Sequence, residues 1–196
     1  ARDVVLTWPQ GMSQRKALQF IQENKGWIDA RRKKISPVQS FSAGKKISIH
    51  GEDYLIVQKA GRGVAHIDGK TLVIYGRPEY LARRLRDFLK ETARQVLEDT
   101  ARQKLSKVNR RFSALRIADP KARWGSCTPE GRLMFSWRLI LAPPAVLDYV
   151  VAHEVAHCVH MNHGKKFWAL CASLTEDAAA ARRWLKTKGP QLMMYP

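Results

Sequence analysis

The chain has 196 residues and a formal net charge of +18, from 35 Lys and Arg against 17 Asp and Glu. This length allows one compact domain, or two small subdomains that share an interface, without a disulfide scaffold. The three cysteines are widely spaced and form no CxxC pair, which is typical of a reducing compartment.

Membrane and export signals are missing from the printed sequence. No run of about eighteen apolar residues occurs, as a membrane-spanning helix would need. The first residues, "ARDVVLTWPQG", lack the basic start, apolar run and cleavage site of a signal peptide. We therefore expect a cytoplasmic protein that does not bind membranes.

The positive charge is unevenly distributed. Residues 1–110 carry 23 basic and 11 acidic side chains, whereas residues 111–196 carry 12 and 6. Such an excess attracts polyanions, so nucleic acid or another polyanion is one expected partner. A basic surface that only favours solubility is the alternative interpretation.

The first 77 residues predict a small α/β subdomain. "DVVLTWP", residues 3–9, predicts a strand, and Ser13 is placed to cap the following helix. Over residues 45–76 the apolar pattern has a period of two, interrupted by "GED", "KAGRG" and "GK", which are hairpin-type connections. We therefore expect a small antiparallel sheet there.

A long basic helix over residues 78–109 is predicted to divide the chain, because leucines recur at helical spacing and the other face is rich in Arg and Lys. After it, "RFSALRIAD" and "LMFSWRLIL" predict two strands joined by the loop "PKARWGSCTPEGR", and Pro143 and Pro144 begin another helix. The expected fold class is α+β, with subdomains at residues 1–77 and 78–196.

The segment "VVAHEVAHCVHMNH", residues 150–163, has the spacing of a metal site. His153 and His157 are one helical turn apart, so both imidazoles can hold one ion. In an HExxH arrangement the intervening acid, here Glu154, acts as general base on a water that the metal activates. Three protein ligands and an open position are the usual catalytic zinc arrangement, so we expect Zn²⁺.

His163 is the favoured third ligand. His160 would lie about 10.5 Å from His153 along a continuous helix, too far for both to reach one ion. His163 is ten residues after His153, the spacing at which metzincin-type sites bring a third His to the metal. Those sites have Gly at the position of His160, so we expect this chain to turn one or two residues later, at Asn162.

A carboxylate is the alternative third ligand. In a thermolysin-like His₂Glu site, Glu176 or Asp177 on the following helix would take this place. Sequence spacing alone does not decide between His163 and these two residues.

The segments "RWGSC" and "SWRLILAPPAVLDYVVAHEVAHCVHMNHGKKFW" resemble the YgjP-like metallopeptidase family, a zincin group related to SprT and WLM domains. The resemblance covers most of the chain and is strongest from Arg123 to Trp168. It implies a zincin-like catalytic subdomain with zinc on His153, His157 and His163, and with Glu154 as the catalytic acid-base residue. It also implies that the strand around "LMFSWRL" is the edge strand that pairs with an extended substrate.

Three functions follow as hypotheses. The first is a zinc-dependent peptidase acting on proteins or peptides, and the relation to SprT implies substrates associated with nucleic acid. The second uses the same metal and base as a nucleotide pyrophosphatase, although no P-loop or Rossmann glycine motif is present. The third is a non-catalytic module with structural zinc that binds nucleic acid, which would require a closed four-ligand site.

Four further residues are candidates for stabilising an oxyanion, although a structural role is the favoured interpretation of each. They are Arg123, Arg138, Tyr149 and Tyr195. Cys158 follows His157 directly, so it points about 100° away around the helix and is expected to be a packed thiol. Trp168 and Trp184 are expected in the core.

Overall fold

The computed structural model describes residues 5–33 and 39–196. The chain divides into two compact units, Ala1–Val38 and Gln39–Pro196. Among the described residues, no helix has the length and apolarity needed to cross a membrane.

The first unit contains two helices, α1 (Gln14–Glu23) and α2 (Lys25–Lys33). The Ser13 side chain accepts a hydrogen bond from the Lys16 amide at 3.4 Å, so the predicted helix cap is confirmed. The single predicted helix is interrupted at Asn24. Residues 5–9 of the predicted strand are irregular, since no strand in the described part of this unit pairs with them, and residues 3 and 4 lie outside the described residues.

The second unit begins with a four-stranded sheet in the order β1-β2-β4-β3. Its strands are β1 (Lys46–Ile49), β2 (Glu52–Lys59), β3 (His66–Asp68) and β4 (Thr71–Tyr75). The sheet is mixed, because β2 and β4 run parallel, whereas the other two pairs are antiparallel as predicted. After β2 the chain leaves a gap of one strand and forms β3 at the edge of the sheet. It then turns back and fills the gap with β4, which runs antiparallel to β3 and parallel to β2.

A tight hairpin connects β1 and β2 and meets the second half of the unit. His50 and Gly51 have φ angles of 50° and 87°, the left-handed pair that a two-residue type I′ turn requires. A Cβ at Gly51 would lie 2.9 Å from Cδ of Pro144, so the turn lies against the start of the site-bearing helix.

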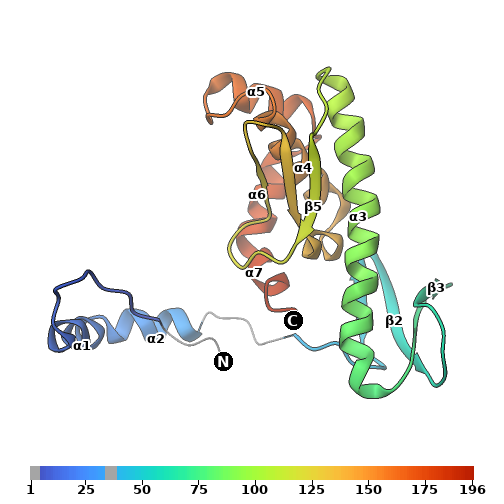
Figure 1. Ribbon diagram of the computed structural model, residues 1–196, viewed down its shortest axis with the longest axis horizontal. Helices are drawn as coiled ribbons and strands as arrows, with labels where there is room; N and C mark the ends of the chain where they lie inside the picture. Colours follow the sequence, from blue (N-terminus) through green and yellow to red (C-terminus); the bar gives the residue numbers. More distant parts are fainter. Residues whose placement is uncertain (1–4, 34–38) are drawn as a thin grey trace. The chain divides into compact units, whose positions relative to one another are not determined.

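The predicted long helix is confirmed as α3 (Leu81–Lys107), preceded by a 3₁₀ turn, η1 (Pro78–Tyr80). Its 27 residues correspond to about 40 Å of helix. Apolar residues recur every four positions along its buried face, from Leu81 and Leu85 to Ala101 and Leu105. This one face contacts the first sheet near its start and the second sheet near its end, so α3 joins the two (Figure 1).

The second sheet has three strands in the order β5-β7-β6. They are β5 (Ala114–Ala118), β6 (Gly125–Cys127) and β7 (Arg132–Ser136). The first predicted strand is present as β5, but the second is a strand only up to Ser136, because residues 137–141 form a 3₁₀ segment. The predicted loop between the two strands contains β6. The expectation that "LMFSWRL" forms an edge strand is wrong, because β7 pairs on both sides and β6 takes the edge.

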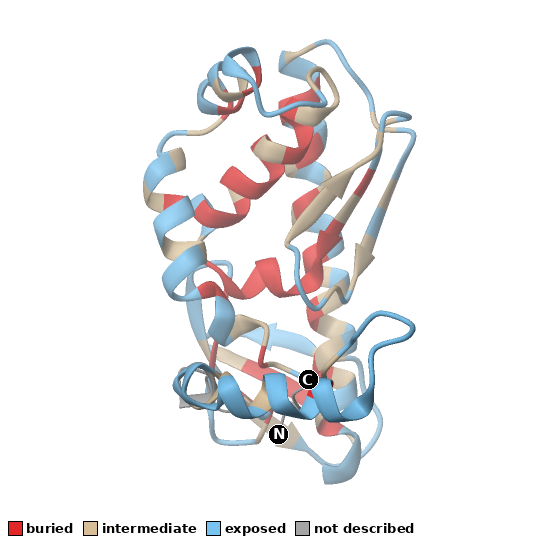
Figure 2. Cartoon of the chain, turned by 90° about the vertical axis from the view of Figure 1, so that its left-hand side faces the viewer, coloured by how far each residue is buried: buried red, intermediate tan, exposed pale blue. Residues whose placement is uncertain are grey.

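The site-bearing helix is α4 (Pro144–His157), followed by α5 (Lys165–Ser173), α6 (Ala178–Thr187) and α7 (Gly189–Leu192). The chain reaches it from β7 through a 3₁₀ segment, η2 (Trp137–Leu141), whose side chains are all buried. Apolar residues surround α4 on nearly every side, as expected for a central helix. The buried residues, red in Figure 2, form the interior around it.

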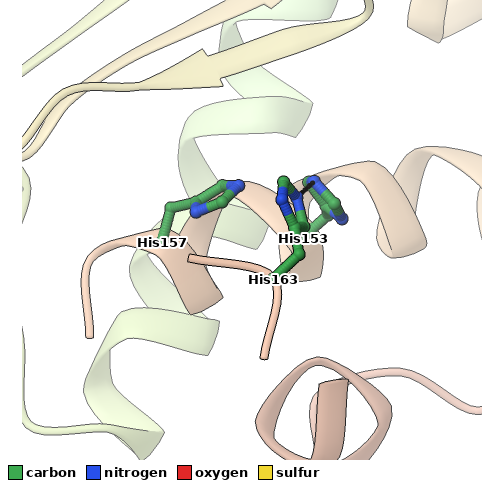
Figure 3. A group of neighbouring side chains, drawn as sticks. All are labelled: His153, His157 and His163. Atoms are coloured by element: carbon green, nitrogen blue, oxygen red, sulfur yellow. Dashed lines mark hydrogen bonds between the residues drawn. The ribbon is translucent and has the colours of Figure 1, made fainter. Parts of the chain in front are cut away.

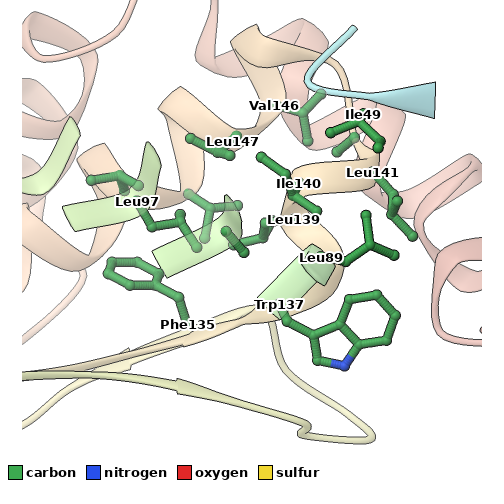
Figure 4. Packing of buried hydrophobic residues seen from close by; sticks show 14 of the residues in the cluster. Ile49, Leu89, Leu97, Phe135, Trp137, Leu139, Ile140, Leu141, Val146 and Leu147 are labelled. Carbon is green, nitrogen blue, oxygen red and sulfur yellow. The ribbon is translucent and has the colours of Figure 1, made fainter. Parts of the chain in front are cut away.

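One apolar cluster runs through the whole second unit. Side chains from β1, α3, η2 and α4 meet in it, including Ile49, Leu89, Ile140 and Leu147 (Figure 4). The predicted α+β class is therefore confirmed. The predicted boundary between residues 77 and 78 falls within this shared core, and it stays a prediction.

Candidate metal centre

Three histidines from two adjacent segments meet at the end of α4. His153 and His157 lie one turn apart on this helix, and His163 follows in the loop before α5 (Figure 3). One ligand nitrogen from each lies within 4.8 Å of the other two. The structure thus brings together the three residues that the spacing argument and the resemblance selected.

The distance between two of these nitrogens fits a shared metal ion. The Nε2 atoms of His153 and His163 are 3.2 Å apart. Two ligands of a tetrahedral zinc ion, each about 2.05 Å from the metal, would be about 3.3 Å apart. The donor set of three imidazoles also suits Zn²⁺. The residues present therefore fit the ion that the motif implies.

The turn that delivers His163 starts earlier than predicted. Helix α4 ends at His157, and the amides of Cys158 and His160 bond back to the last helical carbonyls. The chain bends again at residues 161 and 162, so the expected turn at Asn162 is present, and no residue from 158 to 163 has a positive φ because α4 has already ended at His157. Because the chain leaves the helix here, no glycine is needed at His160.

The same turn orients His157. Its Nδ1 lies 3.2 Å from the backbone oxygen of His160. In the tautomer that donates this hydrogen bond, Nε2 carries the lone pair and is free to bind a metal. His160 therefore contributes to the site through its carbonyl, and not through its imidazole.

Two aromatic side chains of α5 surround the histidines. The Phe167 ring lies 5.0, 4.5 and 4.6 Å from the rings of His153, His157 and His163, and Phe167 is fully buried. The half-buried Trp168 lies 5.5 Å from His163 and 5.8 Å from His153. Sequence reasoning assigned Trp168 only to the core. The sequence signal for both residues is the "FW" after "NH", which is part of the pattern that resembles the family.

Glu154 lies beside the histidines but faces β6. A Cβ at Gly125 would lie 2.7 Å from both the Cγ and the Oε1 of Glu154, so glycine is required for this close approach. Burial raises the pKa of Glu154 to about 7; Cys158 adds to this shift and the charge of Arg123 opposes it. A carboxylate with a pKa near 7 is suited to general acid-base chemistry at neutral pH.

The electrostatic environment keeps His153 uncharged. Burial lowers its pKa to about 4, and the neighbouring imidazoles and Arg182 act in the same direction. Burial also lowers the pKa of His157. Both side chains are therefore neutral at pH 7, which is the state that binds a metal ion.

The comparison with protein families agrees with this geometry. Residues 1–188 match the family described as YgjP-like, metallopeptidase domain. The chain belongs to the YgjP-like metallopeptidase family. Neither the search of curated proteins nor the search of solved structures gave a match. The predicted resemblance is confirmed, and membership makes the YgjP-like chain a metal-dependent hydrolase by family.

The alternative carboxylate ligands of this YgjP-like chain lie elsewhere. Asp177 is the N-cap of α6 and accepts a hydrogen bond from the Ala180 amide at 2.8 Å. Glu176 and Asp177 line a hollow together with Thr100 and Lys104 of α3. Within the described residues, neither carboxylate joins the group that His153, His157 and His163 form.

The four oxyanion candidates divide into two pairs. Arg138 is buried and donates to the Tyr195 carbonyl at 2.6 Å and to Asp119, so both Arg138 and Tyr195 have structural roles. Arg123 lies near enough to oppose the pKa shift of Glu154, and the Tyr149 ring is 6.1 Å from that of His153. These two remain beside the YgjP-like site.

A further cation near the YgjP-like site was missed from the sequence. Arg182 on α6 has its guanidinium carbon 4.9 Å from the centroid of the Trp168 ring. Its charge also contributes to the lowered pKa of His153, after burial and the other imidazoles. No motif marked Arg182, because it lies nineteen residues beyond His163 in a different helix.

Proposed function

We propose that this protein is a zinc-dependent peptidase in which His153, His157 and His163 hold the ion and Glu154 is the general base. The convergence of the three imidazoles at spacings that suit one ion carries the proposal. Among the described residues this group has three members, which favours a catalytic site with an open position over a closed structural site.

The chemistry follows from what the side chains offer. A zinc ion held by the three imidazoles would polarise a scissile carbonyl and acidify water. Glu154 accepts the proton of the attacking water and later transfers it to the leaving amine. Its raised pKa, near 7, lets it perform both transfers at neutral pH. Gly125 leaves room for the carboxylate, and Phe167 and Trp168 exclude water from one side.

The edge of the second sheet supports a peptide as substrate. Strand β6 pairs with β7 through one edge, and no strand of the described residues pairs with its other edge. Since β6 also contacts α4, an extended peptide added to this free edge would run past Glu154. Backbone hydrogen bonds would then align the scissile bond with the histidines.

The second part of the proposal is that the protein substrates are associated with nucleic acid, which this chain binds beside the site. Arg102, Arg110 and Arg111 line a hollow of about 750 Å³ at the end of α3, where the Arg102 guanidinium lies 4.8 Å from the Phe112 ring. The hydrogen bond with Cys127 lowers the pKa of the Cys158 thiol, and the charge of Arg110 lowers it further. Because Cys158 is the C-cap of α4, this influence of Arg110 means that the hollow lies near the end of α4. Cations and an aromatic ring are the side chains that bind single-stranded nucleic acid.

Peptide hydrolysis tests the central part. We expect the zinc-loaded protein to cleave members of a mixed peptide library, and Glu154→Gln to lower kcat by about 10²- to 10⁴-fold while retaining zinc. Glu91→Gln changes an exposed carboxylate on α3 and serves as the matched control. Pyrophosphate release from nucleoside triphosphates without any peptide cleavage would favour the pyrophosphatase hypothesis and contradict the proposal.

Salt-dependent binding tests the nucleic-acid part separately. We expect single-stranded DNA to bind with an affinity that falls as salt rises, by a slope of about −0.7 per neutralised phosphate. Arg110→Gln with Arg111→Gln should weaken binding and reduce this slope. The control pair Lys59→Gln with Arg62→Gln removes the same charge from the exposed end of β2 and the connection that follows it. Equal losses in both double variants would contradict a site at the end of α3.

A further inference from the structure

Two cysteines that are 31 residues apart in sequence face each other beside the metal centre. The Sγ atoms of Cys127, at the end of β6, and Cys158, the C-cap of α4, are 3.5 Å apart. Both side chains are half-buried and both thiols are free. We propose that Cys127 and Cys158 are a redox-active dithiol that a peroxide converts into a reversible disulfide.

The surroundings favour a disulfide over a second metal site. Two thiolates alone do not complete a zinc site, which uses at least three protein ligands. Among the described residues, the only group of three or more potential ligands is His153, His157 and His163. The third cysteine, Cys171, is fully buried on α5. The two half-buried thiols therefore have each other as the available reaction partner.

Only a short movement is needed to form the bond. A disulfide has an S–S distance of about 2.05 Å, so the two sulfurs must approach by about 1.5 Å. The contacts they would give up are weak sulfur hydrogen bonds: Cys127 donates to the Thr128 carbonyl at 3.3 Å, and Cys158 to the Glu154 carbonyl at 3.8 Å. Rotation about χ1 of each residue, with small backbone shifts, can provide the approach.

The reaction balances with hydrogen peroxide as the oxidant. The sulfur of one cysteine attacks a peroxide oxygen, the O–O bond breaks, and one water leaves as a sulfenic acid forms. The second thiol then attacks the sulfenic sulfur, the S–O bond breaks, and a second water leaves with the thiol proton. The two sulfurs lose two electrons in total, and the peroxide gains them.

A bond at this position would link both sides of the site. Cys158 follows His157 directly, and Cys127 is two residues after Gly125, which lies against Glu154. The small backbone shifts that accompany the bond would therefore fall beside His157 on α4 and beside Gly125 on β6. Residues that orient metal ligands typically change metal affinity by about 10- to 100-fold when they are altered, so we expect the disulfide to weaken metal binding by about tenfold. This consequence rests on the proposed function, whereas disulfide formation does not.

Peptide mapping tests disulfide formation directly. The full-length protein is treated with hydrogen peroxide, digested without reductant and analysed by mass spectrometry. We expect a Cys127–Cys158 linked peptide in the wild type and in Cys171→Ser, reversed by dithiothreitol, and no such peptide in Cys127→Ser or Cys158→Ser. Links that involve Cys171 or two chains, or sulfinic acids on unlinked cysteines of the folded wild type, would overturn the proposal.

Metal retention tests the consequence. Zinc content is measured before and after peroxide treatment, each protein being compared with its own untreated sample. We expect the wild type to lose affinity for zinc and to recover it after reduction, while the Cys127→Ser Cys158→Ser variant is unaffected. This variant also controls for oxidation of the exposed Met161. A linked peptide with unchanged zinc affinity would overturn the coupling to the site and leave the disulfide in place.

Discussion

Gly125 and Glu154 occupy a space that allows only one of them to carry a side chain. A Cβ at Gly125 would lie 2.7 Å from the Oε1 of Glu154, far inside van der Waals contact. The carboxylate therefore rests on the backbone of β6, which buries it and raises its pKa. The glycine of "RWGSC" thus acts on the chemistry through the position of Glu154.

Substitution of Gly125 should affect catalysis more than metal binding. In Gly125→Ala the new methyl group displaces the Glu154 carboxylate, so we expect kcat to fall by about 10²-fold, the lower end of the range for loss of a general base. Zinc content should stay at the wild-type level. Gly26→Ala is the control, because no atom lies within 4 Å of a Cβ there. Wild-type kcat in Gly125→Ala would contradict the assigned position of Glu154.

The raised pKa of Glu154 predicts a pH-dependent effect on the stability of the metal-free protein. The pKa is 4.5 in the unfolded chain and about 7 in the folded one. The folded state therefore binds more protons between these values, and its free energy of unfolding falls as pH rises through this range. Above pH 7 the buried carboxylate destabilises the fold by about 3 kcal/mol.

Urea unfolding of chelator-treated protein checks this effect. We expect Glu154→Gln to match the wild type near pH 5 and to exceed its stability by about 2 to 3 kcal/mol near pH 8. The lowered pKa of His153 makes the free energy of unfolding rise with pH, which is the opposite trend. This contribution is the same in the wild type and in Glu154→Gln, so it cancels when their stabilities are subtracted. Glu91→Gln should show no such trend. A stability difference that does not change with pH would contradict the burial of an ionisable carboxyl at this position.

Phe167 should support both the fold and the metal site, since its ring contacts all three histidines and is fully buried. We expect Phe167→Ala to lower the free energy of unfolding by about 3 to 5 kcal/mol. Zinc affinity should fall by about tenfold, as for other residues that orient ligands. Denaturant titration and zinc titration measure the two effects. Phe20→Ala, where the ring is 56% exposed, is the control, and equal effects of both substitutions would contradict this role.

The parts of the fold predicted from sequence are those set by local periodicity. The spacing of leucines determined the extent of α3, and the HExxH spacing placed His153 and His157 on one helical face. Pro144 marked the first turn of α4 correctly. In each case the residues that interact are only three or four positions apart.

The missed features depend on contacts between distant segments. Three residues of "RWGSC" formed the unpredicted edge strand β6, because β7 supplied the hydrogen bonds and α4 the packing surface. The parallel pairing of β2 and β4 arises from a crossover that no local pattern marks. For the same reason Arg182 and the Cys127–Cys158 contact were not predicted.

The central claim is that His163, and not His160, completes the metal site, and zinc content per chain tests it most directly. Wild type, His163→Ala and His160→Ala are purified in the same metal-buffered solution and measured by elemental mass spectrometry. We predict about one zinc in the wild type and in His160→Ala, whose backbone carbonyl still orients His157, and a large loss in His163→Ala. Full zinc retention by His163→Ala, or an equal loss in both variants, would contradict the three-histidine site.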